Sequence, residues 1–120
     1  MKLLLSVSER LYSLVLLNQF KGNLEILTDI LEDIKGFRIT EKEWEKANKQ
    51  INTVTSEDGK PITSWTWDDI KGGEKEIEIT KSTRDYLIEK IKEANDKGQF
   101  TLQDHAAISL NSKLSGNKKV

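Results

Sequence analysis

The sequence predicts an α+β fold that is mostly helical and contains a small antiparallel sheet, and three observations lead to this class. Apolar residues recur at intervals of three and four along several stretches, as on the buried face of a helix. The segment 52–67 is rich in β-branched residues and contains the Asp-Gly turn signal of a β-hairpin. Residues 76–79 alternate between acidic and apolar side chains, which is typical of a half-buried strand.

Three helices are expected in the first half of the chain. Ser6 with Glu9, and Thr40 with Glu43, have the spacing of a capping box, in which a hydroxyl precedes a carboxylate by three residues. Gly36 follows the last apolar residues of the second helix, so we expect it to be a left-handed C-cap. The expected helices cover residues 7–18, the stretch from Asn23 to Gly36, and residues 41–50.

The second half is expected to alternate strands with helices. The hairpin over residues 52–67 is followed by a loop at 68–73 and then by the third short antiparallel strand. The longest helix, over residues 81–97, begins at Thr80 or Ser82 and ends at Gly98. A short last helix is expected over residues 102–113.

Size and composition restrict the class of protein. A length of 120 residues suits one domain, so we expect residues 1–115 to form a single compact domain and residues 116–120 a flexible basic tail. Lys and Arg number 19 and Asp and Glu number 20, which excludes a polybasic tail and an acidic mimic of DNA. There is no cysteine, so disulfides, thiolate nucleophiles and cysteine-ligated metals are excluded.

The apolar N-terminal run stops at Ser6 and is interrupted again by Glu9 and Arg10. It is shorter than the roughly 7–15 apolar residues of a secretory leader and the roughly 20 of a membrane span. We therefore expect a cytoplasmic protein that does not partner a membrane.

Residues that could carry chemistry are few. His105 is the only histidine, and Asp68 and Asp69 lack the spacing of a calcium loop. Phosphate-binding, dinucleotide-binding and nucleophile-elbow motifs are absent. We expect no catalytic residue, no metal, no cofactor and no enzymatic activity. The competing hypothesis of an enzyme or metal protein requires a pocket that collects Asp68, Asp69 and His105.

Trp65 and Trp67 are the candidate protein-interaction residues. They share one face of the predicted hairpin because side chains alternate along a strand. Tryptophan is usually well buried, which favours a role in the core, yet it is also enriched in binding hot spots. Either location is consistent with the sequence.

A nucleic-acid interface is the alternative. Three helices followed by a hairpin is the element order of a winged helix, with residues 41–50 as its recognition helix. The basic face would comprise Lys42, Lys46, Lys49 and Lys60. Within the recognition helix three glutamates balance the three lysines, whereas affinity for DNA comes largely from lysines and arginines that neutralise phosphates. A winged-helix shape without DNA binding is therefore the expected outcome.

Several stretches follow one another in a recognisable order over nearly the whole chain. They are Ser8–Leu11, Leu14–Leu17, Gly22–Asn23, Trp65 with Trp67, Glu74–Ile79 and Gly98–His105. In these stretches the chain resembles a group of short bacteriophage and prophage proteins of gut bacteria that have no assigned activity. It departs from them in its Ser8-Glu9 start, its longer hairpin and its C-terminal end. The resemblance implies the cytoplasm of a bacterial host.

Together these observations lead to one hypothesis of function. We expect a small, non-enzymatic, phage-type protein that binds another protein, either to modulate a host factor or to assist particle assembly. The expected partner is a protein, either a different protein or a second copy of this chain. Nucleic acid is the alternative partner.

Overall fold

The computed structural model describes residues 1–101 and 104–115. Of these residues, 54% are helical and 19% lie in strands, and the strands form two small antiparallel sheets. The α+β class is therefore confirmed. The basic tail expected over residues 116–120 lies outside the described residues.

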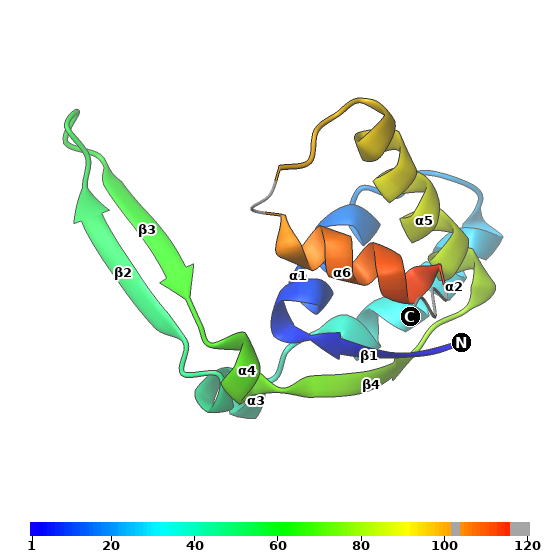
Figure 1. Cartoon of the computed structure of the whole chain (residues 1–120), viewed down its shortest axis with the longest axis horizontal. Helices are drawn as coiled ribbons and strands as arrows, with labels where there is room; N and C mark the ends of the chain where they lie inside the picture. Colours follow the sequence, from blue (N-terminus) through cyan, green and yellow to red (C-terminus); the bar gives the residue numbers. More distant parts are fainter. Residues whose placement is uncertain (102–103, 116–120) are drawn as a thin grey trace. The chain divides into compact units, whose positions relative to one another are not determined.

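The elements follow one another along the chain as Figure 1 shows. They are β1 (Lys2–Ser6), α1 (Val7–Leu17), α2 (Leu24–Phe37), α3 (Glu41–Lys46), β2 (Gln50–Thr55), β3 (Pro61–Thr66), α4 (Asp69–Gly72), β4 (Glu74–Glu78), α5 (Lys81–Asp96) and α6 (His105–Leu114). Their contacts form two compact units. The core unit comprises Met1–Arg38 and Glu74–Val120, and the hairpin unit comprises Ile39–Gly73. The single domain expected over residues 1–115 stays a prediction.

The sheet of the core unit joins β1 to β4 in antiparallel register, with Leu3 opposite Ile77. The sequence predicts β4 but groups it with the hairpin, and this grouping is wrong because β4 pairs with β1 instead. The strand β1 itself was not expected. Leu3 and Leu5 are buried while Leu4 is 53% exposed, so the period of a strand is present but hidden within an unbroken leucine run.

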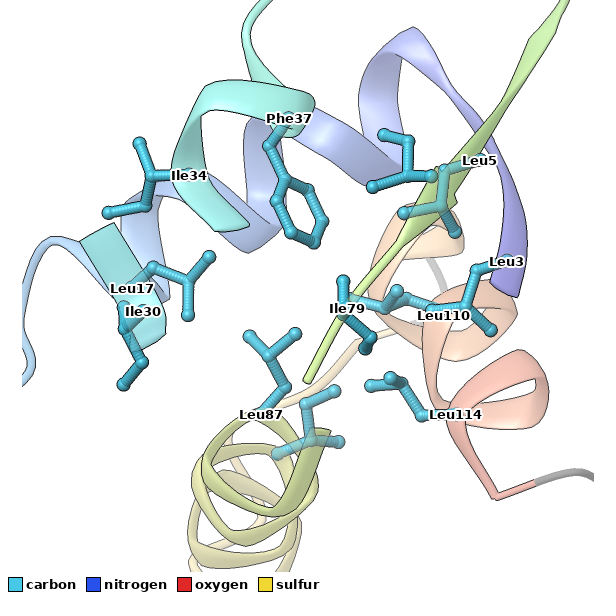
Figure 2. Packing of buried hydrophobic residues seen from close by; sticks show 12 residues of the cluster. Leu3, Leu5, Leu17, Ile30, Ile34, Phe37, Ile79, Leu87, Leu110 and Leu114 are labelled. Atoms are coloured by element: carbon cyan, nitrogen blue, oxygen red, sulfur yellow. The ribbon is translucent and has the colours of Figure 1, made fainter. Parts of the chain in front are cut away.

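The core lies between this sheet and four helices. Figure 2 shows its side chains pointing towards one another from β1, α1, α2, β4, α5 and α6. The buried residues of the cluster are Leu3, Leu5, Leu17, Ile30, Ile34, Phe37, Ile77, Ile79, Leu87, Ile91, Leu110 and Leu114. The cluster residues of α2, α5 and α6 recur at intervals of three or four, as on the buried face of a helix, whereas α1 supplies Leu17 alone to this cluster.

Short-range hydrogen bonds fix where the helices begin. The Ser6 hydroxyl accepts from the Glu9 N–H at 3.2 Å, and the Glu9 carboxylate accepts from the Ser6 N–H at 2.8 Å. Thr40 and Glu43 form the same capping box at the start of α3. These boxes satisfy backbone donors that the first turn of a helix leaves without partners.

Three helix ends differ from the expectation. Gly36 is not a left-handed C-cap but lies inside α2, where a β-carbon would come within 3.3 Å of Ile77 Cγ2, so glycine permits the close approach of β4. The helix α3 ends at Lys46, and Asn48 with a φ of 56° reverses the chain before β2. The last helix begins at His105, later than expected.

A buried carboxylate joins α2 to the start of α5. Asp33 Oδ2 accepts hydrogen bonds from the Thr80 backbone N–H at 2.9 Å and from the Thr80 hydroxyl at 2.7 Å. It also accepts one from the Thr83 hydroxyl. An acidic group at the N-terminus of a helix is favourable because the free N–H groups there carry partial positive charge.

Candidate interaction surface

The hairpin of β2 and β3 is exposed along its whole length. The two strands are antiparallel, with Ile51 opposite Trp65 and Val54 opposite Ile62. All twelve of their residues are exposed, and none of them is charged. The turn closes with a hydrogen bond of 2.9 Å from the Ser56 N–H to the Lys60 carbonyl. The hairpin thus presents two uncharged faces.

Three tryptophans gather at the base of this hairpin, and we call Trp44, Trp65 and Trp67 the tryptophan cluster. The ring of Trp44, from α3, lies 6.3 Å from that of Trp65 and 5.5 Å from that of Trp67 between centroids. Both pairs meet edge to face, the arrangement that aromatic quadrupoles favour. The cluster holds α3 against one face of the hairpin.

Lys49 lies over this cluster. Its ammonium is 3.7 Å from the centroid of the Trp65 ring and 4.7 Å from that of Trp44. Such a cation over an exposed indole stabilises by about 0.5–1 kcal/mol. The sequence assigned Lys49 to a basic face, whereas the structure packs it on the tryptophans.

The two tryptophans singled out from the sequence differ in exposure. Trp65 is 51% exposed. Trp67 is half-buried, and its indole N–H donates to Asp69 Oδ1 at 2.9 Å. Trp65 is therefore available to a partner, and Trp67 mainly supports the unit.

Sequence reasoning missed part of this surface. It singled out neither Trp44 nor the strand residues Ile51, Val54 and Ile62, which are more than half exposed. The absence of charge from both strands was the signal that could have found them, since exposed strands usually carry charged residues.

An open hollow of about 430 Å³ adjoins the tryptophan cluster. It is lined by Glu41, Trp44, Glu45, Asn48, Lys49 and Ile51. The lining therefore combines two carboxylates with one lysine, one amide and two apolar side chains. The other lysines of the alternative interface, Lys42, Lys46 and Lys60, are exposed in the same unit.

The residues of the enzyme hypothesis have local roles in the structure. Asp68 caps α4 by accepting from the Lys71 N–H at 3.1 Å, and Asp69 accepts from Trp67. His105 begins α6, which belongs to the core unit. Within residues 1–101 and 104–115, no three histidine, aspartate or glutamate side chains gather as metal ligands would.

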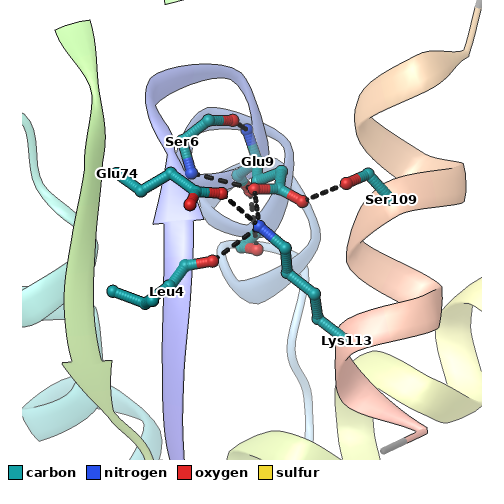
Figure 3. A network of polar contacts seen from close by, with 7 residues as sticks. Leu4, Ser6, Glu9, Glu74, Ser109 and Lys113 are labelled. Carbon is teal, nitrogen blue, oxygen red and sulfur yellow. Dashed lines mark hydrogen bonds and ion pairs between the residues drawn. The ribbon is translucent and has the colours of Figure 1, made fainter. Parts of the chain in front are cut away.

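A polar network in the core unit ties α6 to α1 and to both strands of the sheet (Figure 3). The Lys113 ammonium lies 2.7 Å from Glu9 Oε1 and 2.7 Å from Glu74 Oε2, and it donates to the Leu4 carbonyl at 2.6 Å. Ser109 donates to the other oxygen of Glu9 at 2.6 Å. Its charged groups pair with one another, so the network holds the fold together.

The electrostatics of this network favour its charged form. Burial pushes the pKa of Glu9 upward, but the hydrogen bonds from Lys113, Ser109 and Ser6 outweigh burial, so this pKa lies below its ordinary value of 4.5. Burial pushes the pKa of Lys113 downward, but Glu74 and Glu9 outweigh it, so that pKa lies above 10.5. Both shifts point to a stable ion pair.

Comparison with known proteins adds no relative. No protein-family model, no curated protein and no solved structure matches the chain. None of the helices in the described part of the chain combines the length and hydrophobicity needed to span a membrane.

Proposed function

We propose that this chain is a small, non-enzymatic, phage-type protein that acts by binding another protein through its hairpin. The observation that carries the proposal is the uncharged, fully exposed pair of strands β2 and β3. Trp65, in β3 near the base of the hairpin, is the residue that we expect to contribute most to binding.

An uncovered hairpin of this kind is costly in water. A two-stranded hairpin is at best marginally stable unless one of its faces packs against something. Here Ile51 and Trp65 are exposed on one face, and Val54 and Ile62 on the other. Taking such a side chain from full exposure to full burial contributes about 1.5–3 kcal/mol, and these side chains are still more than half exposed, so a partner that covers one of them gains about half of that amount.

Trp65 has the properties of a binding hot spot. Tryptophan is enriched among the few interface residues that carry most of the binding energy. Its ring is held by Trp44 and Lys49, so little conformational freedom is lost when a partner covers it. The resemblance to phage and prophage proteins supports modulation of a host factor or assistance in particle assembly.

The test is capture of partners by the tagged full-length chain from a bacterial lysate, with and without nuclease. We expect to capture a protein whose binding survives nuclease treatment. Its affinity for the W65A variant should be at least about tenfold weaker than for the wild type. The matched control is I70A, because Ile70 is 92% exposed in the same unit but lies outside the strands. Equal capture by the wild type and W65A would contradict the role of Trp65.

The alternative function is winged-helix-like binding of nucleic acid, for which Lys42, Lys46 and Lys60 would contact phosphates. The packing of Lys49 on the tryptophan rings and the short α3 favour the protein partner over this alternative. Fluorescence anisotropy with random duplex DNA at low salt tests it. Binding at tens of micromolar or tighter supports the alternative, since nonspecific binding typically falls at about 10⁻⁴–10⁻⁶ M at physiological salt.

A further inference from the structure

One edge of the hairpin carries backbone groups that have no strand beside them. Successive residues of an antiparallel strand direct their N–H and C=O groups alternately towards and away from the partner strand. The hydrogen bond from the Ser56 N–H to the Lys60 carbonyl fixes this alternation. Counting back from Ser56 through the register, the backbone groups of Ile51, Thr53 and Thr55 point away from β3.

The two outer edges of the hairpin are not equivalent. By the same alternation, Pro61, Thr63 and Trp65 form the outer edge of β3. Proline has no N–H to donate, so this edge is blunted against further pairing. The outer edge of β2 contains neither proline nor charge. Among the described residues, no third strand joins this sheet.

We propose that the outer edge of β2 pairs with β2 of a second copy of this chain. The two strands run antiparallel about a two-fold axis at Thr53, which gives the four-stranded order β3, β2, β2, β3. The inference rests on the proposed function, because it names one protein partner of the same hairpin, and it assigns that partner to the strand edge.

The register follows from the outward-pointing groups. With Thr53 opposite its own copy, Ile51 lies opposite Thr55 of the second copy, so every outward residue of β2 faces another outward residue. Each such pair exchanges both of its backbone hydrogen bonds. If the pairing were shifted by two residues, one of the three outward-pointing residues in each β2 strand would lie opposite a residue outside the other β2 strand. The register centred on Thr53 therefore makes the most hydrogen bonds.

Charge favours a second copy as the partner. Near a two-fold axis each side chain approaches its own copy, so a charged residue there would repel itself. The strand β2 carries no charge, so nothing of this kind opposes self-pairing. Lys49 precedes β2 and Glu57 lies in the turn after it, so antiparallel pairing brings opposite charges towards each other at both ends of the paired strands. The rest of the chain is unlike this strand, since charged residues make up 32% of the sequence.

The first test uses single-cysteine variants, because the chain has no cysteine of its own. In the proposed pairing the two Thr53 Cα atoms are about 5.5 Å apart, within the roughly 4.4–6.8 Å of a disulfide. We expect mild oxidation to convert T53C into a covalent dimer much faster than T63C. Thr63 is the matched control, since it faces Thr53 across the hairpin and its hydroxyl lies 3.3 Å from that of Thr53. Equal crosslinking of T53C and T63C would overturn the proposal.

The second test measures mass by sedimentation equilibrium of the full chain. The wild type and T63K should dimerise, whereas T53K should be monomeric because two like charges meet on the axis. Mixing T53K with T53E should restore dimers, which an unfolded variant could not do. A wild type that stays monomeric up to its solubility limit, or a T53K variant that dimerises like T63K, overturns the proposal.

These outcomes separate the inference from the proposed function. A monomeric wild type whose Trp65 is still needed to capture another protein would overturn self-pairing and leave the proposed function in place. The opposite outcome is a chain that dimerises through Thr53 while W65A captures other proteins as well as the wild type does. That outcome would support self-pairing and overturn the role of Trp65.

Discussion

Lys113 and Glu9 form an ion pair of 2.7 Å that joins residues 104 positions apart in the sequence. The pair connects the last described helix to the first, and Glu74 of β4 shares the same ammonium. Glu9 is only 2% exposed, so its charge depends on these partners rather than on water. The network therefore contributes to the stability of the core unit.

Replacing Glu9 by glutamine should destabilise the core unit by about 2–3 kcal/mol, because Lys113 loses a buried, charged hydrogen-bond partner. Urea unfolding followed by far-UV circular dichroism measures this loss. The control is K92M, which removes an exposed ion pair with Asp96 and should cost about 0.5 kcal/mol or less. Similar losses in E9Q and K92M would show that the network is not important for stability.

The same pair predicts a dependence of stability on pH. The folded-state pKa of Glu9 is lowered, so its contribution is present above its ordinary value of 4.5 and is lost as the pH falls through the folded value. The pKa of Lys113 is raised, so its contribution is present below 10.5 and is lost as the pH rises through its folded value. The melting temperature of the wild type should fall more than that of E9Q between about pH 7 and about pH 3. An equal fall in both proteins would contradict the assignment to Glu9.

Replacing Asp33 by alanine should cost about 1–3 kcal/mol, because it removes the acceptor of the buried Thr83 hydroxyl and of the Thr80 N–H that precedes α5. Thermal unfolding gives the size of the effect. The neighbouring variant E32Q removes only an exposed ion pair with Lys35, so it should change stability by about 0.5 kcal/mol or less. A D33A protein as stable as E32Q would show that this carboxylate is not needed to join α2 to α5.

All three tryptophans lie in the hairpin unit, so their fluorescence reports on this unit, while far-UV circular dichroism reports mainly on the helices of the core unit. Within Ile39–Gly73, which the structure describes in full, Ala47 is the one buried hydrophobic residue. Fluorescence should therefore change at lower urea than circular dichroism.

The variant L87A sharpens this comparison. Leu87 is fully buried, and its truncation should lower the stability of the core unit by about 2–5 kcal/mol. The fluorescence transition should stay where it is in the wild type. If both transitions coincide and move together, the chain unfolds as the single domain that its length predicts.

Local patterns were enough to predict much of the fold. Residues close in sequence set the capping boxes at Ser6 and Thr40 and the hairpin turn at Gly59. Their physical causes, a side-chain oxygen near a free N–H or a positive φ, are contained in a few neighbouring residues.

Long-range partners could not be predicted in this way. Nothing near Leu3 specifies that β1 pairs with β4, and nothing near Gly36 specifies that Ile77 will lie against it. The candidate surface was found in part, through Trp65 and Trp67. Its other aromatic residue, Trp44, comes from a helix whose distance from the hairpin depends on tertiary packing.

The pairing of β1 with β4 sets an order of events during synthesis. The register joins Lys2 to Glu78, so the first strand leaves the ribosome well before its partner exists. At about 5–20 residues per second, the delay is roughly 4–15 s. During that interval the leucines of β1 remain exposed to chaperones and to neighbouring nascent chains, and the core closes only once the second half of the chain has emerged.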